Sequence, residues 1–65
     1  MNTAHEIESL RKAIRITLAS TTRLQMLARG AVSEGLRAGF ERLAAADEQN
    51  VASYRAKLAA LGVTA

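Results

Sequence analysis

His5, Glu8 and Ser9 are the residues of this sequence whose types and spacing come closest to supporting chemistry. In a helix their i, i+3, i+4 spacing would put them on one face, where they could form a metal site or a catalytic pair. Catalysis, however, needs several titratable groups that converge in a pocket, and a first helical turn is normally solvated. We therefore interpret them as a solvated helix start.

No other catalytic or ligand-binding motif is present. The sequence has no Cys, and it contains no HExxH zinc motif, glycine-rich phosphate loop or nucleophile elbow. We expect no catalytic residue, no metal site and no cofactor, and we expect that the protein is not an enzyme.

The basic residues suggest a different kind of site, one for an anionic partner. The first half of the sequence contains Arg11, Lys12, Arg15, Arg23 and Arg29. No acidic residue lies between Glu8 and Glu34, and the whole chain carries a net charge of +3. Such a run can contact phosphates or an acidic protein. Because no aromatic residue lies within it to stack on bases, nucleic-acid binding remains the alternative to a solvated basic face.

The elements that carry these residues are predicted to be helical. Ala, Leu, Arg and Glu favour helices, Pro is absent, and no alternating pattern indicates a strand. We predict a single all-α domain over residues 1–65, with helices over about 3–29 and 34–61 and a turn at about 30–33. With 65 residues, such a chain has little core of its own.

Local signals mark the ends of both helices. Thr3 and Glu6 have the spacing of a capping box. Ser33 is a predicted N-cap of the second helix, and Gly30 and Gly62 are predicted to end the two helices in the left-handed conformation. One unbroken helix is disfavoured because Gly30, Gly35 and Gly39 would each cost about 1 kcal/mol. A further alternative has three short helices, with a break near Asp47.

Large apolar residues at helical spacing predict the seam between the two helices. In the first helix they are Ile7, Leu10, Ile14, Leu18 and Leu24, together with Thr21. In the second they are Leu36, Phe40, Leu43, Val51, Tyr54, Leu58 and Leu61. Asp47 and Asn50 interrupt this seam opposite Thr17, Leu18 and Thr21. They either lie at its edge or form a buried polar layer that sets the register.

A second, thinner set of small and apolar residues predicts contacts outside the hairpin. It consists of Ile16, Leu27, Ala38, Ala45, Ala52 and Ala59. One hairpin can bury only one face of each helix, so the other face needs a partner, and a second copy is the simplest one. We therefore expect a homo-oligomer, with a dimer that forms a four-helix bundle as the favoured state.

These patterns favour a small, non-catalytic interaction protein. It would be a self-associating structural or adaptor protein, or an accessory subunit of a larger assembly. The alternative is a small basic dimer that binds nucleic acid or acts as a regulator. The N-terminus does not resemble a signal peptide and no uncharged run approaches the ~20 residues of a membrane-spanning helix, so we expect a cytoplasmic location.

Overall fold

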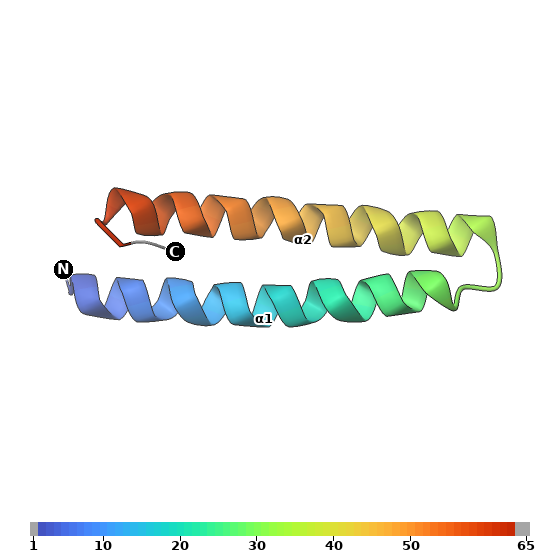
Figure 1. Ribbon diagram of the computed structural model, residues 1–65, viewed down its shortest axis with the longest axis horizontal. Helices are drawn as coiled ribbons and strands as arrows, with labels where there is room; N and C mark the ends of the chain where they lie inside the picture. The colour runs from blue at the N-terminus through green and yellow to red at the C-terminus, as the bar shows by residue number, and fades with distance from the viewer. Residues whose placement is uncertain (1, 64–65) are drawn as a thin grey trace.

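Two long antiparallel helices make up the structure, a computed structural model that describes residues 2–63. Helix α1 (Thr3–Arg29) and helix α2 (Glu34–Ala60) lie side by side along their whole length (Figure 1). The hairpin is elongated, with extents of 47 × 18 × 14 Å. The predicted all-α hairpin is confirmed. The three-helix alternative is wrong, because α2 continues without a break through Asp47.

The start of α1 differs from the predicted capping box. Asn2, and not Thr3, is the N-cap residue, and its Oδ1 accepts a hydrogen bond from the backbone N–H of His5 at 3.2 Å. Asparagine caps a helix at least as well as threonine, so the helix gains one more residue by starting at Thr3. The N-cap of α2 is the predicted one, since Ser33 Oγ accepts from the backbone N–H of Leu36 at 3.2 Å.

The two helices end differently. Gly62 has a φ of +82°, as predicted, and the N–H groups of Gly62 and Val63 donate to the carbonyls of Ala59 and Leu58, each at 3.0 Å. This is the Schellman arrangement that satisfies the last carbonyls of a helix. The prediction for Gly30 is wrong. Its φ is −91°, an ordinary conformation, because its N–H closes one more helical hydrogen bond, to Met26 O at 3.2 Å.

This difference predicts opposite effects of alanine at the two glycines. Gly30→Ala should stabilise the hairpin by about 0.4–1 kcal/mol, because it restricts the unfolded chain and its Cβ would meet only Met26 O at 3.8 Å. Gly62→Ala should destabilise it by about 1–2 kcal/mol, because alanine is strained at positive φ. Urea unfolding of the two variants measures both effects. Equal effects would contradict the assigned conformations.

A strict heptad pattern defines the contact between the helices. Half-buried Glu6, Ala13, Ser20 and Gly39 each lie one residue before a position of this pattern, and half-buried Ala31 and Val63 lie outside the helices. The remaining buried or half-buried residues follow steps of three and four. We call them the core residues: Ile7, Leu10, Ile14, Thr17, Thr21, Leu24 and Ala28 in α1, and Phe40, Ala44, Asp47, Val51, Tyr54, Leu58 and Leu61 in α2. Among the described residues, the fully buried apolar side chains are Ala28, Ala44, Val51 and Leu58. Two of these are alanines, so the hairpin buries little apolar surface by itself.

Three leucines predicted for this seam lie outside it. Leu18, Leu36 and Leu43 are 42%, 51% and 55% exposed. The heptad pattern contains Thr17 in place of the adjacent Leu18, and Ala44 in place of the adjacent Leu43. Because one residue turns a helix by about 100°, that single step moves a side chain from the contact to its side. The prediction chose these leucines because they are large. The spacing of the other core residues decides which face of each helix meets the other helix.

The middle of the core is polar. Thr21 is buried, and its hydroxyl donates to the carbonyl of Thr17 in its own helix at 3.0 Å. Asp47 is half-buried from the other helix, and its Oδ2 is shielded from solvent with no hydrogen-bond partner in the described part of the chain. Asn50 is exposed. The interruption therefore places Asp47 inside the contact and leaves Asn50 outside it.

Candidate functional site

The two flat sides of the hairpin differ in chemistry, and the core pattern separates them. In a helix, the residues just before and just after a core residue lie about 100° to either side of it. Arg29 and Ala45, which follow core residues Ala28 and Ala44, line one groove together. The residues that follow core residues in both helices therefore share one side, and those that precede core residues share the other.

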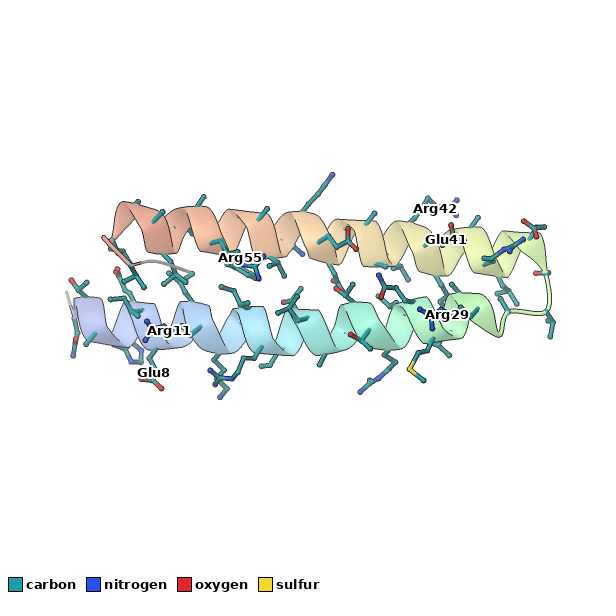
Figure 2. The ribbon with its side chains drawn as sticks, viewed as in Figure 1. Glu8, Arg11, Arg29, Glu41, Arg42 and Arg55 are labelled. Carbon is teal, nitrogen blue, oxygen red and sulfur yellow. The ribbon has the colours of Figure 1, made fainter. Side chains whose placement is uncertain are left out.

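The side that follows the core residues is the charged flank. It contains Glu8, Arg11, Arg15, Leu18, Thr22, Gln25 and Arg29 from α1, and Ala38, Glu41, Ala45, Glu48, Ala52, Arg55 and Ala59 from α2, all of them exposed. Figure 2 labels Arg11 and Arg29 on α1 and Glu41 and Arg55 on α2. The flank carries the bases Arg11, Arg15, Arg29 and Arg55 together with the acids Glu8, Glu41 and Glu48, so it is not a uniformly positive surface.

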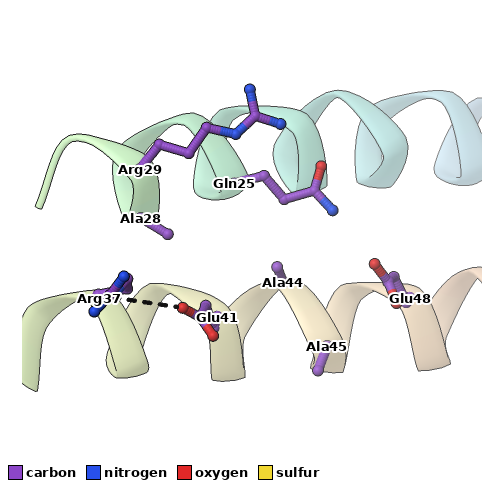
Figure 3. A pocket seen from close by; sticks show the side chains of 8 residues that line it. All are labelled: Gln25, Ala28, Arg29, Arg37, Glu41, Ala44, Ala45 and Glu48. Carbon is purple, nitrogen blue, oxygen red and sulfur yellow. Dashed lines mark ion pairs between the residues drawn. The ribbon is translucent and has the colours of Figure 1, made fainter. Parts of the chain in front are cut away.

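A groove of about 500 Å³ opens on the charged flank near the turn (Figure 3). Its floor is made of Ala28 and Ala44, and polar side chains such as Gln25 and Glu48 surround it. Arg37 at its edge forms ion pairs with Glu34 and, at 4.0 Å, with Glu41. These pairs are exposed and helix-local, so each contributes a few tenths of a kcal/mol. They also neutralise the groove, which makes it a poor receptor for a phosphate.

The opposite side is the apolar flank. It contains Glu6, Ser9, Ala13, Ile16, Ser20, Arg23 and Leu27 from α1, and Leu36, Gly39, Leu43, Ala46, Asn50, Ser53 and Lys57 from α2. Ile16, Leu27, Leu36 and Leu43 are 60%, 45%, 51% and 55% exposed. Its charges are confined to Glu6, Arg23 and Lys57, so large apolar side chains dominate the half nearest the turn.

The residues predicted for outer contacts do not share one side of the molecule. Ile16 and Leu27 lie on the apolar flank, whereas the alanines spaced by seven from Ala38 to Ala59 lie on the charged flank. Leu36 and Leu43 were not predicted for an outer surface because they were assigned to the inside of the hairpin. The heptad phase was the signal that could have identified them, since Leu43 precedes core residue Ala44 and Leu36 lies seven residues before Leu43.

The predicted anionic-partner contacts are likewise divided. Arg11, Arg15 and Arg29 lie on the charged flank, and Arg23 lies on the apolar flank. Lys12 is exposed two residues after core residue Leu10, on the outer surface of α1. The hairpin therefore does not gather these five side chains into one patch.

Residues His5, Glu8 and Ser9 are all exposed near the start of α1. Within residues 2–63, no group of three or more His, Asp or Glu side chains could hold a metal ion. No helix in the same range is long and apolar enough to cross a bilayer.

Comparisons of this chain with known proteins find no relative. No protein-family model, no curated protein and no solved structure matches this chain. Function must therefore be inferred from the two flanks of the hairpin, of which the apolar one has the chemistry of a protein–protein contact.

Proposed function

We propose that this protein is a small, non-catalytic interaction protein that works by self-association, as a structural or adaptor subunit in the cytoplasm. Four exposed side chains on the apolar flank carry the proposal: Ile16, Leu27, Leu36 and Leu43. Large apolar residues gathered on one side of a monomer usually mark a contact with another chain. Here they lie on two helices that bury few large side chains between them.

A four-helix bundle is the state that this pattern favours. Isolated helices depend on packing for most of their stability, and a two-helix contact built around Ala28, Ala44, Val51 and Leu58 provides little of it. Two hairpins that pack side against side would cover the half-buried core residues Leu24 and Phe40 as well as the apolar flank. In this proposal a second copy completes the core that one copy lacks.

The dimer is tested by the dependence of stability on concentration. The melting temperature should rise as the protein concentration rises, because association stabilises the folded form by mass action. Light scattering over the same concentration range should show the mass change from 6.9 kDa towards twice that value. A monomer at every concentration, with a sharp melting transition that does not depend on concentration, would refute self-association.

Nucleic-acid binding is the second candidate, and the distribution of charge counts against it. The bases of the charged flank share it with Glu8, Glu41 and Glu48, and Lys12 and Arg23 lie outside that flank. Phosphate binding needs bases that act together, and it weakens steeply as salt rises. Assembly through apolar side chains does not weaken in this way, so the salt dependence separates the two candidates.

A further inference from the structure

We infer that the second copy packs apolar flank against apolar flank, with both turns at the same end of the bundle. In this arrangement Leu27 of one copy lies against the hollow beside Gly39 of the other. The inference rests on the proposed self-association, to which it adds the face, the direction and the contact residue.

The exposed area of the hairpin fits a second copy. The chain exposes 4792 Å². A compact monomer of 6.9 kDa is expected to expose about 4,000 Å², so the hairpin exposes roughly 800 Å² more. A standard protein–protein interface covers about 800 Å² on each partner. The excess therefore matches the area that each partner covers in a stable dimer.

Two symmetric arrangements bring the apolar flanks together. Arg29 and Glu34 lie at the turn and Thr3 and Ala60 at the open end, with α2 shifted towards the turn relative to α1 (Figure 1). Figure 3 shows Ala28 of α1 across from the stretch between Arg37 and Glu41 of α2, so Leu27 lies near the level of Gly39. With both turns at one end, α1 of each copy faces α2 of the other at the same level. With the turns at opposite ends, each helix faces its own copy, reversed.

The contacts differ between the two arrangements, and their chemistry favours the first. With both turns at one end, Leu27 faces the hollow beside Gly39, and Glu6 lies at the same open end as Lys57, which has the opposite charge. With the turns at opposite ends, Leu27 would meet Glu6 and Leu36 would meet Lys57. That arrangement would bury charges against leucines without a partner, which is costly. The fit of Leu27 beside Gly39 and the closeness of Glu6 to Lys57 therefore favour the arrangement with the turns together.

A hollow on α2 supplies the place for Leu27. It has a volume of about 360 Å³ and is lined by Gly35, Leu36, Gly39, Phe40, Arg42 and Leu43. A Cβ at Gly35 would meet nothing within 4 Å, and one at Gly39 would meet only the guanidinium of Arg42, at 4.0 Å. The hairpin itself therefore does not require either glycine, although each costs about 1 kcal/mol in a helix. Close approach by a second copy gives them a role.

The direction can be measured with one spin label per chain, because the sequence has no native cysteine. Val32→Cys places the label at the turn, where the side chain is almost fully exposed. Pulsed electron paramagnetic resonance of the dimer should give a single distance below about 30 Å, because neighbouring helices pack only 8–10 Å apart. A distance near the 47 Å length of the hairpin would place the turns at opposite ends and overturn the inference.

A filled hollow provides the second test. Gly39→Leu should weaken dimerisation by about tenfold or more, because overpacking a contact costs about 1–3 kcal/mol. It should not reduce helix content, because leucine is the better helix former. The matched control is Ala45→Leu on the charged flank, which should leave the dissociation constant within about twofold. An unchanged constant for Gly39→Leu, or equal weakening by both variants, would overturn the inference.

The experiments distinguish a failure of the proposed self-association from a failure of the proposed face and direction of the contact. A dimer by light scattering with a long label-to-label distance removes only the direction proposed here. A dimer weakened by Ala45→Leu and not by Gly39→Leu moves the contact to the charged flank. A wild-type chain that stays monomeric at every concentration removes the inference together with the proposed self-association.

Discussion

Leu58→Ala is expected to lower the free energy of unfolding by about 2–5 kcal/mol, and thereby to remove most of the stability of this small hairpin. Leu58 is the largest fully buried side chain among the described residues, with 1% exposed. Truncation would lose its transfer energy and would leave a cavity between helices that bury few other large side chains. Circular dichroism during urea unfolding measures the loss.

The matched control for this prediction is Leu18→Ala, the same truncation at a leucine that is 42% exposed on the charged flank. We expect it to cost less than half as much, because less apolar surface is returned to water and no cavity forms. Equal costs at the two positions would mean that the helices do not meet through the core residues described here.

Asp47→Leu is expected to have the opposite sign and to stabilise the hairpin by about 1–3 kcal/mol. Asp47 lies within the contact, and its Oδ2 is shielded from water without a hydrogen-bond partner. The hydroxyl of Thr21, a buried polar group of the same core, already donates to Thr17 O. Removing the carboxylate should therefore remove a penalty and add apolar surface to the core. Thermal and urea unfolding measure the gain.

The oligomeric state of Asp47→Leu is the second readout of that variant. A polar residue inside a helical core can fix register or partner number at some cost in stability. We expect the variant to be more stable but to populate several oligomeric species in light scattering. The matched control is Glu48→Leu on the charged flank, which should change the unfolding free energy by about 0.5 kcal/mol or less. If Asp47→Leu forms the same single oligomer as the wild type, Asp47 does not set the register.

The sequence was sufficient to predict the architecture. Helix-favouring composition, the glycine at position 30 and the serine cap at position 33 indicate two helices and a turn, and these are local properties of the chain. Ser33 and Gly62 behave as predicted because a cap or a positive φ involves only neighbouring backbone. Asn2 took the place of Thr3 because both residues are good caps and sequence alone ranks them poorly.

The faces of the helices were harder to predict. Leu18 and Leu43 each have a smaller neighbour, Thr17 and Ala44, that occupies the core position. A choice between adjacent residues depends on the phase of the whole seam and on how closely the two backbones approach. For the same reason, the candidate interface was predicted only in part. Ile16 and Leu27 were identified, whereas Leu36 and Leu43 were assigned to the inside.

The position of Leu58 also determines how the two helices come together during folding. Contacts near the turn close short loops, whereas the contact between Leu58 and the start of α1 closes nearly the whole chain. Folding should therefore proceed from the turn towards the open end, with contacts that are mostly local and fast to form. Leu58 is buried late on this route. Its contacts therefore slow unfolding and have little influence on the rate of folding.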